Sequence, residues 1–239
     1  MLFAFTDFQH QGPYQGELEA AARRYSNQPF IHLMHDAPRF QPASAGRLLS
    51  ALSRQFLPGD ICLAVVDPGV GSARYPVAVE SRGIWFVGPD NGLLSSVTET
   101  DASAQWWEIT WHPAPLSSSF HGRDLFAPFA GQLAAGYSPT AIGARPLYDP
   151  IQAHCPEASI IYIDGYGNCV TGIPAGRLQE DQTVTVGGRP LSHGFTFSSV
   201  PPGEPLWYCN SMGLVEIAIN QASAADSLQL EIGNEVSLT

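Results

Sequence analysis

The chain has 239 residues, enough for one large domain or two smaller ones, and 44% of them are hydrophobic, so a full core can be buried. Its formal net charge of −11 would repel a phosphate backbone, which argues against nucleic acid as a partner. Only 14% of the residues are charged, well under the usual quarter, which favours a surface partly covered by other subunits.

Targeting and metal-binding signals are weak in this sequence. The four cysteines are scattered without a CxxC pair, so zinc-ribbon spacing is absent. The segment 1–5 has no basic residues and meets a polar pair too soon for a signal peptide. No apolar run is long enough to cross a bilayer. We therefore expect a cytoplasmic protein that makes no contact with a membrane.

The first part of the chain alternates between strand and helix patterns. Short apolar runs at 2–5, 30–34 and 61–66 predict strands, and the last of them is apolar throughout, as in a sheet covered on both faces. Segment 17–25 has helical character, and segment 42–56 has apolar residues at helical spacing. The order β-α-β-α-β predicts an α/β domain with a mostly parallel central sheet.

The next segments continue this domain. Runs at 77–80 and 84–87 flank Ser81-Arg82-Gly83 and predict a β-hairpin. A further strand is predicted at 106–110, and a helix that ends near Ala135 follows the polar stretch that begins at Phe120.

Residues 143–156 are rich in proline and have little periodicity, which predicts a boundary between domains. The remainder consists of short strand-like runs separated by glycine and proline, without a convincing helix, as in a small all-β barrel or sandwich. We therefore predict an α/β domain at 1–145, a linker at 146–156 and a smaller, barrel-like β domain at 157–239.

Polar side chains gather where the predicted strands of the first domain end. Such strand ends lie along one edge of a parallel sheet, so these groups are expected to converge on one crevice. They are Thr6 with Asp7, Asp67 with Arg74, Asp90 with Asn91, and His121 with Arg123 and Asp124. In the second domain the stretches 164–168 and 210–213 have a similar composition.

Each of these motifs also has a structural interpretation. His121 alone is typical of a capping or core histidine, whereas Asp90-Asn91-Gly92 and Asp164-Gly165 are ordinary turn sequences. A metal site is disfavoured because no His-x-His or His-x-x-x-His pair occurs. Five other histidines have no neighbouring motif that indicates a function, and we expect them to be structural or on the surface: His10, His32, His112, His154 and His193.

Taken together, however, the motifs resemble the S-adenosyl-L-methionine (SAM) hydroxide adenosyltransferases, adenosine-forming SAM hydrolases related to the fluorinases and chlorinases. The resemblance runs in family order across nearly the whole chain. It rests on Thr6-Asp7-Phe8 with Pro13-Tyr14 and Gly16, Val65-Val66-Asp67-Pro68-Gly69-Val70-Gly71-Ser72 with Arg74, Gly88-Pro89-Asp90-Asn91-Gly92, Phe120-His121-Gly122-Arg123-Asp124, Tyr162-Ile163-Asp164-Gly165-Tyr166-Gly167-Asn168, and Asn210-Ser211 with Glu216-Ile217-Ala218.

The resemblance implies an α/β domain followed by a barrel-like domain, in a homotrimer that binds SAM between neighbouring subunits. It implies that Asp67, Arg74 and His121 hold and polarise the attacking water, and that Asp7 receives the two ribose hydroxyls. For the rest of the substrate it implies four contacts: Asp164 with the methionine ammonium, Tyr166 and Asn168 with adenine, and Ser211 with the methionine carboxylate. SAM is then the substrate, and neither a metal nor a cofactor is required.

The chain departs from the family pattern at three positions. Gln9 stands where the family usually has glycine, Gly12 where it has aspartate, and Gly172 where it has asparagine. Halogenating relatives replace the acid of the Asp-Pro-Gly-Val-Gly-Ser loop, and this chain keeps it, which favours water over halide as the nucleophile. The alternatives that stay open are a non-catalytic SAM- or adenosine-binding protein, a SAM-dependent halogenase and a metal-dependent phosphoesterase.

Overall fold

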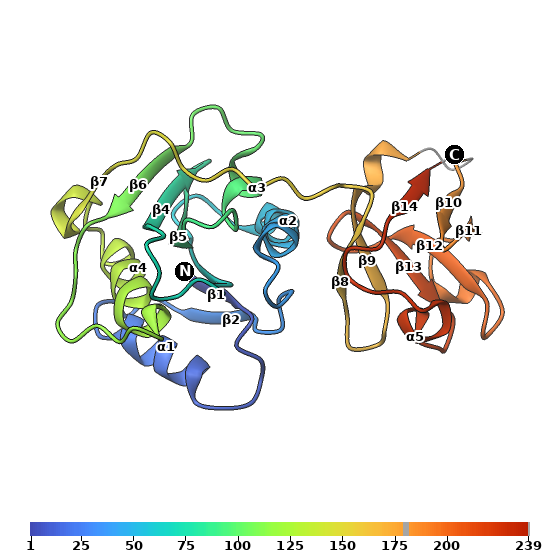
Figure 1. The fold of residues 1–239 in the computed structure, drawn as a ribbon, viewed down its shortest axis with the longest axis horizontal. Helices are drawn as coiled ribbons and strands as arrows, with labels where there is room; N and C mark the ends of the chain where they lie inside the picture. Colours follow the sequence, from blue (N-terminus) through green and yellow to red (C-terminus); the bar gives the residue numbers. More distant parts are fainter. Residues whose placement is uncertain (179–181, 239) are drawn as a thin grey trace. The chain divides into compact units, whose positions relative to one another are not determined.

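The computed structural model describes residues 1–178 and 182–238. The chain divides into two compact units, Met1–His154 and a second unit that begins at Cys155 (Figure 1). Residues 146–154 of the expected linker belong to the first unit. Leu147 N–H donates to the Trp106 carbonyl (2.9 Å), and Ile151 N–H donates to Asp90 Oδ1 (2.9 Å).

The first unit contains a seven-stranded sheet with the order β2-β1-β3-β5-β4-β6-β7. Strands β2, β1, β3 and β5 pair in parallel, whereas β5-β4, β4-β6 and β6-β7 pair antiparallel. The α/β character is confirmed, but the prediction of a mostly parallel sheet is wrong for half of the pairings. The strands are β1 (Leu2–Thr6), β2 (Phe30–Met34), β3 (Ile61–Val65), β4 (Pro76–Ser81), β5 (Ile84–Pro89), β6 (Gln105–Ile109) and β7 (Ala144–Pro146).

The antiparallel half follows from a tight hairpin. Only Arg82 and Gly83 separate β4 from β5, and a connection this short can join only antiparallel strands. Both residues have positive φ, +53° and +75°, the combination that a type I′ turn requires.

Helices cover both faces of this sheet. Helices α1 (Tyr14–Arg23) and α4 (Ala127–Ala134) lie beside each other and pack on the face formed by alternate residues such as Leu2 and Leu63 (Figure 1). On the opposite face, Phe3 of β1 stacks on Phe56 with ring centroids 4.2 Å apart. The other helical segments are α2 (Pro42–Leu52), η1 (Ser53–Gln55), α3 (Ser95–Thr98), η2 (Gly122–Phe126, a π-helix) and η3 (Thr140–Ile142).

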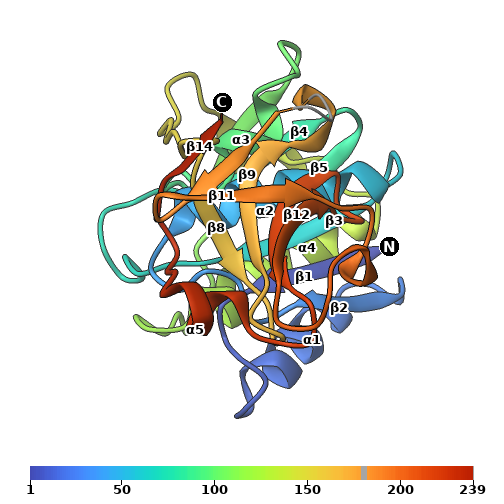
Figure 2. The same cartoon turned by 90° about the vertical axis from the view of Figure 1, so that its right-hand side faces the viewer.

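The second unit contains a sheet with the order β14-β10-β11-β12-β13-β9-β8, antiparallel except between β11 and β12 (Figure 2). Its elements are β8 (Ile160–Ile163), β9 (Cys169–Pro174), η4 (Ala175–Arg177), β10 (Val184–Val186), β11 (Arg189–His193), η5 (Phe197–Ser199), β12 (Pro205–Cys209), β13 (Leu214–Ile219), α5 (Ala224–Leu228) and β14 (Val236–Leu238). The short helix α5, with Ser223 as its N-cap, corrects the prediction of an all-β domain.

The two outer strands of this sheet meet at one end. Ser159 and Glu235 form a β-bridge, and Val236 N–H donates to the Ala158 carbonyl at 2.9 Å. These bonds join the starts of β8 and β14, so the sheet curls into a partly closed barrel around an apolar core that includes Trp207 and Ile217.

Candidate active site

Two carboxylates lie at the same edge of the first sheet. Thr6 at the end of β1 pairs in parallel with Val65 at the end of β3, and Asp7 N–H donates to the Val65 carbonyl at 3.4 Å. Asp7 is one residue beyond β1 and Asp67 two residues beyond β3, so adjacent parallel strands place both acids at their carboxyl ends.

Arg74 holds Asp67 with a two-pronged hydrogen bond. Its Nε lies 3.0 Å from Oδ1 and 3.1 Å from Oδ2 of Asp67, and its Nη2 also donates to Oδ2. The two side chains are only 7% and 5% exposed, and the guanidinium lies 5.2 Å from the ring centroid of Phe126. A guanidinium held by a carboxylate and an aromatic face has little freedom, so its remaining N–H groups point in fixed directions.

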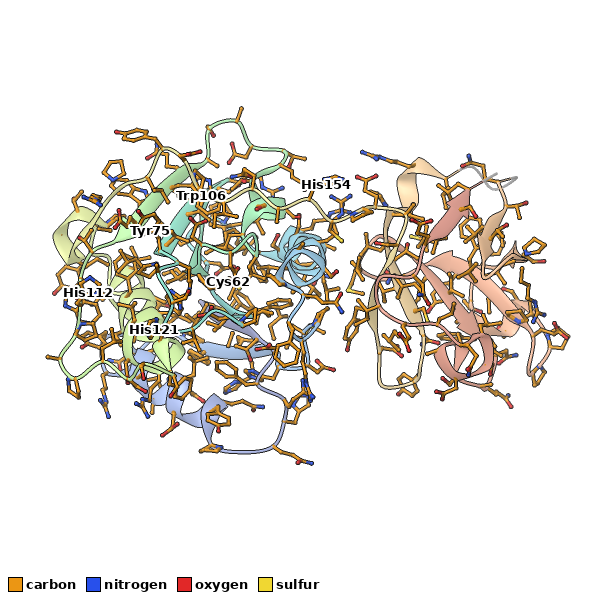
Figure 3. The ribbon with its side chains drawn as sticks, viewed as in Figure 1. Cys62, Tyr75, Trp106, His112, His121 and His154 are labelled. Carbon is orange, nitrogen blue, oxygen red and sulfur yellow. The ribbon has the colours of Figure 1, made fainter. Side chains whose placement is uncertain are left out.

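His121 completes this cluster from the residue before η2, and Figure 3 labels it in the first unit. Its Nδ1 lies 3.1 Å from Arg74 Nη2. Because a guanidinium only donates, Nδ1 must accept, and the imidazole proton is therefore on Nε2. Burial, and then the positive charge of Arg74, lower the pKa of His121, which keeps the ring neutral at pH 7.

A glycine lets the two loops of the cluster approach each other. Gly71, in the loop between Asp67 and Arg74, has φ +79°, and a Cβ at this position would lie 2.5 Å from the Ser118 carbonyl oxygen. A larger residue would separate this loop from the segment that leads to His121.

Asp7 lies close enough to this cluster to feel its charge. Burial, and to a smaller extent Asp67, raise the pKa of the Asp7 carboxyl, whereas its own backbone N–H and Arg39 lower it. The structure therefore brings together four predicted site residues of the first unit: Asp7, Asp67, Arg74 and His121.

The other predicted polar strand ends serve the fold. Asp90 Oδ1 accepts from Ile151 N–H, and Asn91 Nδ2 donates to the Val66 carbonyl at 2.9 Å, which braces the start of the Asp67 loop. Arg123 pairs with Asp124 instead of joining the cluster, with Nε 2.6 Å from Oδ1.

In the second unit, Asp164 organises its own loop. Its Oδ1 accepts from the backbone N–H groups of Tyr166 and Asn168, and its Oδ2 accepts from Asn168 Nδ2, all at 2.9 Å. Gly167 has φ +84° and would carry a Cβ only 2.1 Å from Ser223 Oγ. The loop is therefore a closed turn in which the orientation of the Asn168 amide is fixed.

Tyr166 and Asn168 line one pocket of about 660 Å³. The Asn168 side chain is buried, whereas Tyr166 is 83% exposed. The pocket is lined by apolar and amide side chains, a surface that suits a flat, partly polar ring. The other lining residues are Phe197, Ile219, Asn220, Gln221, Ala222 and Ser223.

Ser211 lies in a turn that Asn210 shapes. Asn210 Oδ1 accepts from the N–H groups of Met212 and Leu214, both at 3.0 Å, and its Nδ2 donates to Glu216 Oε2 at 2.8 Å. Burial raises the pKa of Glu216, and the nearby charge of Asp164 raises it further. The sequence motif contained Glu216, but only the folded unit shows that it supports the turn of Ser211.

The departures from the family pattern lie at positions with unusual backbone conformation or close backbone contact. Gln9 adopts φ +62°, a conformation that glycine reaches without strain, and Gly12 has φ +98°. At Gly172, a Cβ would lie 2.8 Å from the Glu157 carbonyl oxygen, so this backbone approach leaves no room for an asparagine.

Two histidines near Asp7 were not predicted to matter. His35 Nδ1 lies 2.7 Å from Thr6 Oγ1, and His35 Nε2 lies 2.7 Å from His32 Nδ1. The sequence shows that His35 follows a strand. It does not show that this strand is the neighbour of β1, so the contact with Thr6 could not be predicted.

Among residues 1–178 and 182–238, no group of three or more histidine, cysteine, aspartate or glutamate side chains is arranged to hold a metal ion. In the same residues no helix has the length and apolar character needed to cross a membrane.

Comparison with known proteins identifies relatives along the whole chain. The (R)-S-adenosyl-L-methionine hydrolase of Thermus thermophilus is 34% identical over 99% of this chain and 98% of its own length. The hydrolase of the same name from Salinispora arenicola is 35% identical over 81% of this chain and 80% of its own length. A fluorinase of Actinopolyspora mzabensis is more distant, with 24% identity over 87% of this chain and 86% of its own length.

A solved structure shares the fold of the whole chain. A crystal structure of an uncharacterized conserved protein from Thermotoga maritima superimposes with a TM-score of 0.90 at 28% identity, over 100% of this chain and 99% of the other. Residues 2–143 match the family model of the SAM hydroxide adenosyltransferase N-terminal domain, and residues 158–237 match that of the C-terminal domain. The chain therefore belongs to the SAM hydroxide adenosyltransferase family.

Proposed function

We propose that this protein hydrolyses SAM to adenosine and L-methionine. The observation that carries the proposal is the Asp67–Arg74–His121 cluster, in which a neutral imidazole and a fixed guanidinium lie at the carboxyl edge of the sheet beside Asp7. Membership of the family and the names of the hydrolase relatives support the same reaction.

In the proposed reaction a water oxygen attacks the C5′ carbon of SAM. The C5′–S bond breaks and its electron pair goes to sulfur, so the leaving group is the neutral thioether of methionine. A new C5′–O bond becomes the 5′-hydroxyl of adenosine, and one proton is released for each SAM consumed. The leaving group takes no proton, so catalysis depends on holding the water in line and stabilising its developing hydroxide character.

The tautomer of His121 defines its part in this step. With Nδ1 occupied by Arg74, the ring presents Nε2–H, which can donate to the water oxygen and orient a lone pair toward C5′. Asp67 fixes the orientation of Arg74, and the positive charge of Arg74 favours hydroxide character in the attacking water. We assign all three residues to the catalytic centre.

The substrate contacts are part of the proposal. Asp7 receives the ribose hydroxyls, the exposed ring of Tyr166 stacks on adenine, and the fixed amide of Asn168 reads its edge, as an asparagine amide can do with two hydrogen bonds. Asp164 pairs with the methionine ammonium, and Ser211 holds the methionine carboxylate.

We further propose a homotrimer in which each SAM is enclosed by residues of two neighbouring subunits. The low content of charged residues and the exposure of Tyr166 and Phe195, 83% and 79%, favour such coverage. Light scattering on the purified protein is expected to give three times the mass of the chain, and a monomer would contradict this part of the proposal.

The test of the reaction is incubation of the purified protein with SAM, followed by chromatography for adenosine and methionine in equal amounts. Tight binding of SAM without either product would favour a binding protein. A 5′-halo-adenosine formed on addition of chloride or fluoride would favour a halogenase, and activity lost on addition of EDTA would favour a metal-dependent phosphoesterase.

A further inference from the structure

A continuous chain of hydrogen bonds runs from the loop of Asp7 to the surface of α1. Thr6 Oγ1 lies 2.7 Å from His35 Nδ1, and His35 Nε2 lies 2.7 Å from His32 Nδ1. His32 Nε2 lies 3.0 Å from Glu19 Oε2, and Arg23 Nε donates to Glu19 Oε1 at 2.5 Å.

When both imidazoles are neutral, all the hydrogen bonds in this series donate in the same direction. Glu19 can only accept, so His32 donates from Nε2 and must accept at Nδ1. His35 then donates from Nε2 and accepts at Nδ1, which leaves the Thr6 hydroxyl as the donor to His35. Each bond therefore polarises the next one toward the carboxylate.

The same residues hold the backbone on both sides of Asp7, through the Thr6 hydroxyl and through backbone hydrogen bonds of the segment 35–37. Phe8 N–H donates to Thr6 Oγ1 at 3.3 Å, and Gln9 N–H donates to the His35 carbonyl at 2.6 Å. On the other side, Ala37 N–H donates to the Thr6 carbonyl at 3.1 Å. The segment 35–37 thus holds residues 6 and 9, with Asp7 between them.

Burial supports this interpretation. Thr6 and His35 are 0% and 2% exposed, so neither can exchange its partner for water without local opening. Burial, helped by His32 and His10, lowers the pKa of His35 to about 4, which keeps its ring neutral at physiological pH. The hydrogen bonds from Arg23 and His32 lower the pKa of Glu19, so the outer end stays charged.

We infer that Thr6 and His35 are positioning residues that set the orientation of Asp7, with His32 and Glu19 fixing the tautomer of His35. The inference rests on the proposed function, because it gives Asp7 the ribose hydroxyls as its partner. Specificity for a ribose over a 2′-deoxyribose then depends on a hydroxyl group that never touches the substrate.

The test compares Thr6→Val, which removes the hydroxyl at nearly constant volume, with Thr6→Ser, which keeps it. Calorimetry measures binding of adenosine and of 2′-deoxyadenosine to each folded variant, and steady-state assays give kcat and KM for SAM. We expect the wild type to prefer adenosine about tenfold or more, the scale of one hydrogen bond to a charged group. Thr6→Val should reduce this preference at least threefold, and Thr6→Ser should restore it.

A second pair of variants tests whether the effect passes through Asp7. In the Asp7→Asn background, Thr6→Val should cause no further loss of preference, because two residues that act as a unit are not additive. If Thr6→Val does not fold, His35→Asn takes its place, since it loses the contact to His32 and should also lower the preference. The matched control Thr98→Val removes a hydroxyl that donates to the Ser95 carbonyl, far along the chain, and should leave the preference unchanged.

The outcomes separate this inference from the proposed function. A wild-type preference retained in Thr6→Val or His35→Asn would overturn the positioning role, as would a loss that Thr6→Ser fails to restore. A preference that falls in both Asp7→Asn and Thr6→Val, without any hydrolysis of SAM, would overturn the proposed reaction and support the positioning role. Hydrolysis of SAM by the wild type, with a preference for adenosine that Asp7→Asn does not change, would support the proposed reaction and overturn the positioning role.

Discussion

The polar groups of the two units are held in different ways. In the first unit Asp67 and Arg74 are almost fully buried and satisfy each other, so the cluster is formed before any ligand arrives. In the second unit Asp164 is satisfied by its own loop, and Tyr166 is 83% exposed. The first arrangement suits chemistry, which needs groups fixed in place, and the second suits recognition, which leaves surface for a ligand to cover.

The comparison predicts that a substitution in the first cluster lowers turnover and leaves binding intact. We expect Asp67→Ala to reduce kcat roughly a hundredfold or more, because Arg74 and His121 lose their fixed orientation. Stopped assays for adenosine and calorimetry with SAM measure the two effects separately. Asp149→Ala, a change of an exposed acid in the same unit, is the control. Full turnover in Asp67→Ala would show that the Asp67–Arg74–His121 cluster does not contribute to catalysis.

The hydrogen-bond series from Thr6 through His35 and His32 to Glu19 predicts that the stability of the protein depends on pH. The folded pKa of His35, about 4, lies below its ordinary value of 6.5, so between these values the unfolded chain binds a proton that the folded chain does not. Stability should therefore fall as the pH drops from 6.5 to 4, by about 3 kcal/mol from this residue. His35→Gln should lose less stability over this range.

Urea unfolding at several pH values measures this effect, with the exposed His154→Gln as the matched control. Equal pH slopes for the wild type and His35→Gln would show that the ring is not held neutral in the fold.

The second unit predicts the opposite kinetic result. We expect Tyr166→Ala to raise KM for SAM about tenfold, the scale of a lost stacking contact, with little change in kcat. The control is Tyr148→Ala, because Tyr148 is 90% exposed in the first unit and has no proposed contact with the substrate. A large fall in kcat with unchanged KM would contradict the assignment of substrate recognition to Tyr166 and the second unit.

The smallest expected effect concerns Gln9. Its φ of +62° costs free energy that glycine does not pay, so Gln9→Gly should raise the free energy of unfolding by about 1 kcal/mol. Thermal or urea unfolding measures the change, and a destabilised variant would mean that the Gln9 side chain contributes more than its backbone conformation costs.

Much of the first site could be predicted from sequence because its residues follow strand ends. Asp7 and Asp67 each stand just beyond an apolar run, and parallel pairing brings such positions to one edge. The pairing of His32 with Glu19 could not be predicted in this way, since it depends on how α1 is rotated against β2. The hairpin of β4 and β5 could be predicted from its turn, but β7 and α5, with 3 and 5 residues, are too short for a periodic pattern to reveal them.

The most direct test of the central claim is turnover in water enriched in the heavy isotope of oxygen, followed by mass spectrometry of the products. If the His121 cluster directs water to C5′, one heavy oxygen should appear in the 5′-hydroxyl of adenosine and none in methionine. Unlabelled adenosine, or a label in the amino-acid product, would contradict attack of water at C5′.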